Sequence, residues 1–309
     1  MTQPIINVAH FHKTYDGYTA VDDISFTVPA GEIFGLLGPN GAGKTTTLEC
    51  LEGLRQPDSG TLQIAGIDPV KAPHQLRNVI GVQLQSSGMP AAITPDEAMK
   101  LFCAYHGTTP RSDLLDRFGL TAKRKTQFHE LSTGQQRRLA LALAIAHKPR
   151  VLFLDEPTAG VDPISRRAFW ELIYDLAEGG TTILVTTHYM DEAEHCQELV
   201  FIQRGHLVAQ GSPEEVKISQ MHGDVVEVDC DNAGQAVPLL RGLNVFAEVA
   251  LYGALIHVVT DKAAEHIPLI KKTLTGHGLT VISVERIAPS LEDVFISSAR
   301  EAEKVLGVR

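Results

Sequence analysis

The sequence predicts an α/β fold with a smaller α+β unit after it, because three apolar segments have the length and composition of buried parallel strands. These segments span residues 33–37, 151–154 and 182–185, and each is followed closely by glycine or polar residues. A glycine-rich turn and a helical stretch over residues 44–54 follow the first segment. Strand, glycine loop and helix open a βαβ unit, whose continuous apolar strands are covered on both faces.

Shorter patterns surround this core. Residues 5–9 and 24–28 alternate as strands do, and residues 199–202 and 206–209 predict a hairpin. Residues 86–147 have a mostly helical pattern, with a helix start at Thr94. Ligands bind at the carboxyl edge of open α/β sheets. We therefore expect a site where the polar residues follow the three apolar strands.

The pattern changes after residue 212. Strand, helix, two strands, helix and strand follow in the order βαββαβ, which predicts a small ferredoxin-like unit, and residues 291–305 predict a closing helix. We place a first domain at residues 1–215, including a helical subdomain at about 86–147, and an accessory α+β domain at 216–309.

Composition limits the partners of the chain. The 309 residues carry a formal net charge of −10, which argues against nucleic-acid binding and against a polybasic membrane anchor. We expect no signal peptide and no membrane span, because the longest apolar run is far shorter than 18 residues. The four cysteines are scattered without metal-ligand spacing, so we expect reduced thiols.

The glycine-rich turn has the pattern of a phosphate-binding loop, G-x-x-x-x-G-K-[ST]. Glycines let the backbone wrap an anion, and the helix that follows adds the positive end of its dipole. We expect Lys44 to reach the β- and γ-phosphates of a nucleotide and Thr45 to ligate Mg²⁺. The expected nucleotide-binding residues of the loop are Gly38, Pro39, Asn40, Gly41, Ala42, Gly43, Lys44, Thr45 and Thr46.

Two adjacent carboxylates follow the strand over residues 151–154. One carboxylate is needed in the shell of Mg²⁺, and this suits Asp155. A second carboxylate that the metal does not use can orient or deprotonate the attacking water, and this suits Glu156. The alternative is a pair of acids in a solvated turn, which four preceding apolar residues disfavour.

A possible second anion site begins at Ser132. This residue predicts the cap of a helix that runs to about His147, and Gly134 permits close backbone approach. A chain that already has a phosphate loop could use such a helix start on nucleotide held by another copy. By itself, the segment also fits an ordinary helix cap.

Six motifs in order closely resemble the nucleotide-binding subunit of ABC transporters over about residues 4–212. The resemblance implies a P-loop, RecA-like core with antiparallel β and helical subdomains, which binds ATP and Mg²⁺ and hydrolyses the ATP. The motifs are the Walker A loop at residues 38–45, the Q-loop at Gln85, the signature at 131–135, Walker B at 151–156, the D-loop at 159–162 and the H-loop at His188.

The resemblance also implies roles for individual residues. Tyr15 matches the aromatic that stacks on adenine, and Gln85 matches the glutamine that contacts Mg²⁺ and senses a membrane partner. His188 matches the histidine that contacts the γ-phosphate, so the implied catalytic set is Glu156, His188 and Lys44. The residues implied to act across a dimer are Ser132, Thr133, Gly134 and Gln135 of the signature, on the partner's ATP, and Asp162 of the D-loop.

The resemblance thus implies a motor subunit that dimerises, as a homodimer, around two ATP–Mg and drives a separate membrane permease from the cytoplasmic face. A groove in the helical stretch from Gln85 to about Phe118 would receive the permease. Residues 289–295 resemble the tail of multidrug-type exporter ATPases, which favours export. Thr133 stands where the family commonly has glycine, and the D-loop lacks its usual serine. The alternatives are a translation or DNA-repair ATPase of the same superfamily and a regulatory nucleotide binder that does not hydrolyse.

Overall fold

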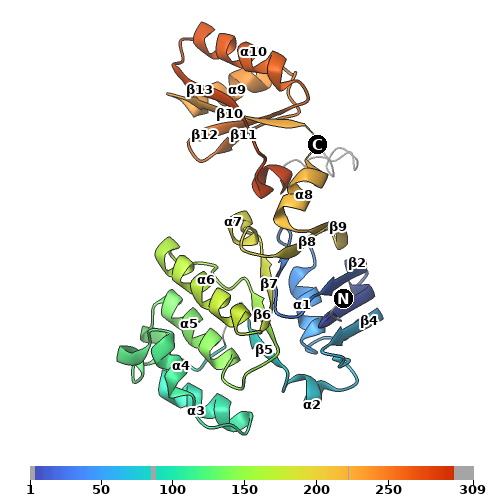
Figure 1. Ribbon diagram of the computed structural model, residues 1–309, viewed down its shortest axis with the longest axis vertical. Helices are drawn as coiled ribbons and strands as arrows, with labels where there is room; N and C mark the ends of the chain where they lie inside the picture. The colour runs from blue at the N-terminus through green and yellow to red at the C-terminus, as the bar shows by residue number, and fades with distance from the viewer. Residues whose placement is uncertain (1–3, 85–87, 222, 296–309) are drawn as a thin grey trace. The chain divides into compact units, whose positions relative to one another are not determined.

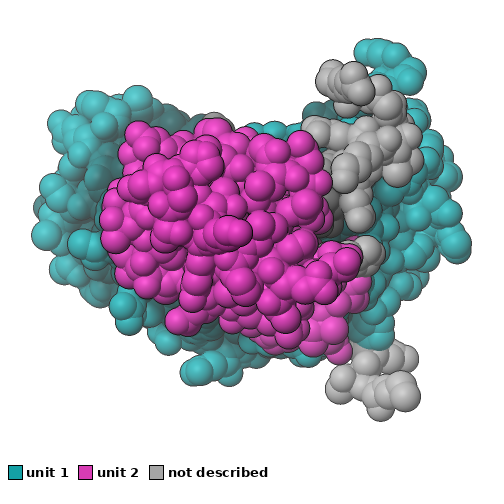
Figure 2. All heavy atoms as spheres, turned by 90° about the horizontal axis from the view of Figure 1, so that it is seen from above, with its two compact units in different colours: residues 1–212 teal, residues 213–309 magenta. Residues whose placement is uncertain are grey.

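The computed structural model describes residues 4–84, 88–221 and 223–295. The chain divides into two compact units, residues 1–212 and 213–309 (Figure 2). The first unit contains two sheets and two hydrophobic cores, and the second unit contains one sheet and one core. The first unit is built on a six-stranded sheet, and the second on a four-stranded one.

The six-stranded sheet has the strand order β5-β6-β7-β3-β8-β9 (Figure 1). Its first five strands are parallel, and β9 returns antiparallel to β8. The predicted buried parallel strand of residues 33–37 is confirmed with the same bounds. The strands are β3 (Ile33–Leu37), β5 (Ile80–Gln83), β6 (Val151–Asp155), β7 (Thr182–Thr187), β8 (Glu198–Gln203) and β9 (His206–Gly211).

Alternate side chains of this sheet enter two different cores, since successive residues of a strand point to opposite faces. Leu152 and Leu154 of β6 join a core that includes Phe169 and Trp170 of α6 (Pro163–Glu178). Phe153, between them, joins the core on the other face, with the side chains of α1 (Lys44–Leu51). The sheet is therefore covered on both faces, as the continuous apolar strands predict (Figure 1).

A three-stranded antiparallel sheet contributes to the second of these cores. Its order is β2-β1-β4, with β1 (Ile6–Tyr15), β2 (Tyr18–Val28) and β4 (Ser59–Ile64). β1 and β2 form a long hairpin whose last pair is Tyr15 with Tyr18 across the turn Asp16-Gly17. This hairpin places Tyr15, the aromatic residue expected at the nucleotide, at the end of its paired strands.

The helical segment of the first unit is confirmed, with irregular stretches between its helices. Thr94 caps α3 with a reciprocal capping box: its hydroxyl accepts from Glu97 N, and the Glu97 carboxylate accepts from Thr94 N at 2.9 Å. The elements are α3 (Pro95–Tyr105), α4 (Ser112–Arg117), the 3₁₀ turns at Thr121–Lys123 and Phe128–Glu130, and α5 (Thr133–Ala144). None of the helices in the described ranges is both long and apolar enough to span a membrane.

Two strands of the first unit were not predicted, and two of its helices are shorter than predicted. β4 begins with exposed Ser-Gly and β5 is four residues long with a glycine, so neither has a strong apolar pattern. The helix expected over residues 44–54 ends at Leu51, just before Gly53 with φ 74°. The helix expected to reach His147 ends at Ala144, before Lys148 with φ 57°. The short helices not predicted are α2 (Pro73–Leu76), α7 (Met190–Ala193) and α8 (Pro213–Gln220).

The second unit is confirmed as a ferredoxin-like α+β fold. Its antiparallel sheet has the order β11-β12-β10-β13, and α9 and α10 pack on one face. The elements are β10 (Asp224–Cys230), α9 (Ala233–Gly242), β11 (Glu248–Tyr252), β12 (Leu255–Thr260), α10 (Ala263–Gly276) and β13 (Val281–Ile287). Residues 291–295 are helical, and the rest of the expected closing helix lies outside the described residues.

A buried histidine–carboxylate pair fastens this last helical turn to the sheet. His257 of β12 is 3% exposed, and its Nδ1 lies 2.7 Å from Oδ1 of Asp293, which is 5% exposed. The other oxygen of Asp293 accepts from the backbone N and the hydroxyl of Ser290. Burial lowers the pKa of His257, but Asp293 and Glu227 outweigh it and hold the pKa above its usual 6.5.

This pair gives the second unit a pH-dependent stability. The raised pKa of His257 means that its contribution is complete below about pH 6.5 and is lost as the pH rises through the folded-state pKa. The pKa of Asp293 is lowered, so its contribution is lost as the pH falls from about 3.8. Urea unfolding of the full chain from pH 5 to 9 should show the second unit losing stability with rising pH, relative to His257→Gln. If the free energy of unfolding of the second unit changed with pH in the same way in the wild type and in His257→Gln, the prediction would be contradicted.

Candidate functional site

The expected phosphate loop connects the end of β3 to the start of α1. A Cβ on Gly38 would lie 2.1 Å from the carbonyl oxygen of Ile202, and a Cβ on Gly43 would lie 2.5 Å from that of Ala20. Gly43 also has φ 106°, in the left-handed region, as the residue before the first turn of α1. The carbonyl of Ala42 accepts from Gly205 N at 3.0 Å. The loop is therefore held closely against β8, the β8–β9 turn and β2, and glycine is required at both positions.

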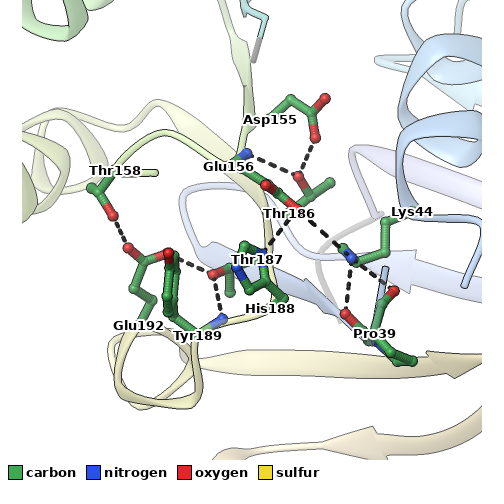
Figure 3. A network of polar contacts seen from close by, with 11 residues as sticks. Pro39, Lys44, Asp155, Glu156, Thr158, Thr186, Thr187, His188, Tyr189 and Glu192 are labelled. Carbon is green, nitrogen blue, oxygen red and sulfur yellow. Dashed lines mark hydrogen bonds and ion pairs between the residues drawn. The ribbon is translucent and has the colours of Figure 1, made fainter. Parts of the chain in front are cut away.

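Lys44 is buried inside this loop. Its ammonium donates to the carbonyl oxygens of Gly38 at 2.8 Å and Pro39 at 3.1 Å, and only 5% of the residue is exposed. Nζ also lies 3.9 Å from Oε1 of Glu156 (Figure 3). Burial lowers the pKa of Lys44, against the opposing effect of Glu156 and Asp155. A buried ammonium group is thus held at the centre of the loop.

A cavity of about 400 Å³ opens over the loop and the start of α1. It combines residues from the loop and α1, the β1–β2 hairpin and the end of β6. The lining residues are Tyr15, Tyr18, Ala20, Asn40, Gly41, Gly43, Lys44, Thr45, Thr46 and Glu156. Gly38, Pro39 and Ala42 are not among the lining residues. Their carbonyl groups accept hydrogen bonds from Lys44 and from Gly205 N and so fix the conformation of the loop.

The two carboxylates at the end of β6 have different surroundings. Asp155 is 4% exposed and accepts a short hydrogen bond from the hydroxyl of Thr186 on β7. Its pKa is raised, mainly by burial, and the bond from Thr186 opposes this shift. Glu156 has φ 43°, which is uncommon for a residue other than glycine, and its backbone N donates to the carbonyl and hydroxyl oxygens of Thr186. This turn separates the two side chains.

His188 follows the end of β7 and meets Glu156. Its Nδ1 lies 3.0 Å from Oε1 of Glu156, and the same oxygen faces Lys44 (Figure 3). The side chain of Glu156 is 11% exposed and that of His188 is 30% exposed. The structure therefore brings together Lys44, Glu156 and His188, which are expected on the basis of the resemblance to form the catalytic set.

Tyr15 lies at the edge of the cavity and has a second tyrosine beside it. The Lys13 ammonium and the Arg55 guanidinium are each 5.3 Å from the centroid of the Tyr15 ring. Tyr18 is 59% exposed and lines the same cavity, with its hydroxyl 3.4 Å from the carbonyl oxygen of Gly41. Tyr18 was not predicted as a site residue; the signal that could have identified it is the Asp-Gly pair between the two tyrosines, which is typical of a tight hairpin.

The helix start at Ser132 forms a capping box. The Ser132 hydroxyl accepts from Gln135 N, and the Gln135 side chain accepts from Ser132 N at 3.0 Å. A Cβ on Gly134 would lie 3.2 Å from the side chain of Ser165, whose own N donates to Asp162 at the start of α6. The signature and D-loop segments are thus neighbours. Residues 132–135 are not among the described residues that line the cavity.

Gln85, expected to contact the metal and the partner, lies outside the described residues. Thr45 and Asp155, the other two expected metal-binding residues, are at the loop and at the end of β6. Their hydroxyl and carboxylate oxygens are of the type that Mg²⁺ prefers. Three buried polar residues behind the site, Thr186, Thr187 and Glu192, were not predicted. Polar residues at strand ends, like the two threonines, are common, and Glu192 is one of several acids in its segment.

Comparison with known proteins places these features in a family. Residues 21–159 match the family described as "ABC transporter". The chain is 36% identical over 302 residues to the Nod factor export ATP-binding protein I of Ralstonia nicotianae, covering 95% of this chain and 93% of the relative. It is 39% identical over 221 residues to the "Probable multidrug ABC transporter ATP-binding protein YbhF" of Escherichia coli. This match covers 70% of this chain and 38% of the relative.

Solved structures agree with this. The structure of cbiO1 from Clostridium perfringens, part of the ABC transporter complex cbiONQ, matches with a TM-score of 0.63 and 29% identity, covering 70% of this chain and 91% of that chain. The loop, the parallel sheet and the carboxylates define a P-loop ATPase. The chain belongs to the ABC transporter family, as one of its ATP-binding proteins.

The glycines of the loop give a stability prediction. Gly41 and Gly43 both have positive φ, but a Cβ meets no atom within 4 Å at Gly41 and meets the Ala20 carbonyl at Gly43. Gly41→Ala should cost about 1–2 kcal/mol of strain. Gly43→Ala should cost a further 1–3 kcal/mol or so, because the neighbouring strand has to move. Urea unfolding of the first unit measures both, and equal losses would contradict the steric explanation.

Proposed function

We propose that this chain is the ATP-hydrolysing motor subunit of an exporter of the ABC type, in which it acts from the cytoplasmic face on a separate membrane permease. The observation that carries this proposal is the meeting of Lys44, Glu156 and His188 at one cavity, with Oε1 of Glu156 lying 3.9 Å from Nζ and 3.0 Å from Nδ1. The group combines a buried cation for phosphate, a carboxylate for water and a histidine that contacts this carboxylate.

Each residue has a separate task. Lys44 exchanges the carbonyl oxygens of its own loop for phosphate oxygens of ATP, while the backbone N–H groups of the loop and α1 bind the same phosphates. Glu156 orients the attacking water and accepts its proton. His188 fixes the orientation of the Glu156 carboxylate and contacts the γ-phosphate. Tyr15 and Tyr18 border the part of the cavity that takes the adenine.

Thr45 and Asp155 fit a magnesium ion that enters with the nucleotide. A hydroxyl and a carboxylate supply hard oxygen ligands, and a cation near Asp155 would favour the ionised form of a carboxylate whose pKa burial raises. The ion, when bound, neutralises charge on the phosphates. Gln85 completes this set by the family resemblance.

A second copy of the chain completes the site. The start of α5, with Ser132, Thr133 and Gly134, is a capped helix N-terminus of the kind that binds anions. In the described part of this chain it does not line the cavity over Lys44. We therefore propose a homodimer in which two ATP molecules lie between the loop of one copy and the signature of the other, with Asp162 at the interface. ATP favours the closed dimer, and hydrolysis reopens it.

Two adjoining cavities of about 240 and 270 Å³ form the proposed permease site. Their shared lining is Glu52, Val82, Phe102 and Leu143, and exposed Leu54, Leu84 and Tyr105 border them. Glu52 is 7% exposed, and no described residue hydrogen-bonds its carboxylate, whose pKa burial raises to about 8. An apolar groove with an unpaired carboxyl group suits an amphipathic cytoplasmic segment of the permease that offers a hydrogen-bond donor.

The relatives favour export over other roles. Those described above are named for Nod factor export and for multidrug transport. A non-transport ATPase for translation or DNA repair is the second candidate of the sequence analysis, and the short distance between the two Walker motifs disfavours it. Co-purification with ribosomes or DNA, in place of a membrane protein, would support that alternative.

Glu156→Gln tests the hydrolytic site. The variant should bind ATP normally but hydrolyse it about 10²–10⁴-fold more slowly, because an amide cannot accept the proton of water. ATP should also hold it as a dimer, since the step that reopens the dimer is lost. Steady-state ATPase assays, ATP titration and light scattering with and without ATP measure the three effects. Hydrolysis at the wild-type rate would refute the role of Glu156.

Cysteine cross-linking tests the permease site. The four native cysteines are buried, and burial raises the pKa of Cys50 to about 11, so a new surface cysteine should react selectively. In membranes with a co-expressed candidate permease, Leu84→Cys and Tyr105→Cys should cross-link to it. Val208→Cys, on β9 at the other edge of the sheet, is the matched control. Products from the control alone, or from none of the variants, would contradict the proposed surface.

A further inference from the structure

Glu192 is a buried acid behind the site that the proposed mechanism does not use. It lies in α7, directly after the turn at His188, and only 1% of the residue is exposed. Burial raises its pKa to about 7. Its exposed neighbours Asp191 and Glu194 show that acids in this segment normally face solvent. Burial of an acid is costly unless its oxygens are bonded, so the contacts of Glu192 require an explanation.

The two carboxylate oxygens of Glu192 bond to two different strand ends. Oε1 accepts a short hydrogen bond from the hydroxyl of Thr158, and Oε2 accepts one of 2.7 Å from the hydroxyl of Thr187 (Figure 3). Both threonines are at most 1% exposed. Thr158 belongs to the segment after β6, and Thr187 is the last residue of β7. One side chain therefore joins two segments that are far apart in sequence.

Each of these segments carries one member of the Glu156–His188 pair. Thr158 lies two residues after Glu156, in a turn closed by the bond from Ala159 N to the Glu156 carbonyl at 3.2 Å. Thr187 immediately precedes His188, and its hydroxyl also accepts from Tyr189 N at 3.0 Å, so the turn at His188 is fixed from both sides. The same two segments are therefore joined twice, once through Glu192 and once through the 3.0 Å contact between Glu156 and His188.

The backbone conformation of Glu156 has to be held by its neighbours, and the Glu192 link can contribute to this. Its φ of 43° is sparsely populated for a residue with a side chain and persists only where the surroundings hold it. Thr186 holds the residue on its amino side, through bonds to Glu156 N. Thr158, fixed by Glu192, holds the chain on its carboxyl side.

We propose that Glu192 is a positioning residue, which bonds Thr158 and Thr187 at once and thereby keeps the carboxylate of Glu156 and the ring of His188 in their catalytic orientation. This inference rests on the proposed function, because it acts through Glu156. A purely apolar filling of the same space would cover the site equally well but could not tie the two turns together. A displacement of about 1 Å at a catalytic group can cost about 100-fold in rate.

Glu192→Gln is the main test, since glutamine keeps the size of the side chain and has one strong acceptor in place of two. The turnover number kcat should fall between about 10- and 100-fold, while the dissociation constant of ATP stays within about twofold of the wild-type value. Thr158→Val, which removes one hydroxyl of the link, should lower kcat in the same direction. Glu194→Gln, an exposed acid two residues away, is the matched control and should keep wild-type turnover.

A second measurement separates positioning from general destabilisation. If Glu192 acts through Glu156 and His188, then adding Glu192→Gln to the double variant Glu156→Gln/His188→Gln should change the single-turnover rate less than twofold, because residues that act as a unit are not additive. A further loss of 10-fold or more in that background would overturn the proposal. Wild-type kcat in Glu192→Gln would do so too. If Glu192→Gln does not fold, Thr158→Val decides: unchanged kcat refutes the link.

The outcomes distinguish this inference from the proposed function. Rapid hydrolysis by the single variant Glu156→Gln would show that Glu156 is not the base. The proposed function would then fail, and Glu192 would have no catalytic carboxylate to position. Slow hydrolysis by Glu156→Gln together with normal hydrolysis by Glu192→Gln would leave the proposed function intact and refute only the role of Glu192.

Discussion

The parallel pairing of β6 with β7 is the constraint on which the site depends. Their register sets Asp155 opposite Thr186, so the carboxyl ends of the two strands stop side by side. Thr186 then contacts Asp155 through its hydroxyl and the backbone of Glu156 through its carbonyl and hydroxyl oxygens. A shift of one residue would turn these side chains to the other face of the sheet. The loop after β3, the next strand, reaches the same edge because β3 is parallel to β7.

Two buried faces make this register secure. Alternate residues of β6 and β7 enter separate cores, one with α6 and one with α1, so both faces of each strand are specified by packing. The sheet therefore supports the site, and the polar residues lie at the last positions of the strands and in the turns directly after them. Burial of the apolar strand residues stabilises the sheet, and the candidate site residues lie at the strand ends and just after them.

The parts of the fold and site that depend on local sequence were predictable. The apolar run at residues 33–37, the spacing of the phosphate loop and the acids after residue 154 each lie within a few consecutive residues. Residues whose role comes from contacts across the fold were not. Tyr18 enters the cavity only because the hairpin pairs it with Tyr15, and Glu192 reads as one more acid in the segment Asp191-Glu192-Ala193-Glu194. β4 and β5 were missed because their neighbours, and not their own patterns, hold them in the sheets.

The left-handed backbone of Glu156 links its proposed role in hydrolysis to the thermal robustness of the fold. A residue with a side chain pays about 1–2 kcal/mol in this conformation, and glycine does not. Replacement by glycine would therefore relieve this strain and remove the carboxylate that is proposed to activate water. An acid at this position thus lowers the stability of the fold, and the proposed role in hydrolysis supplies a reason to tolerate that loss.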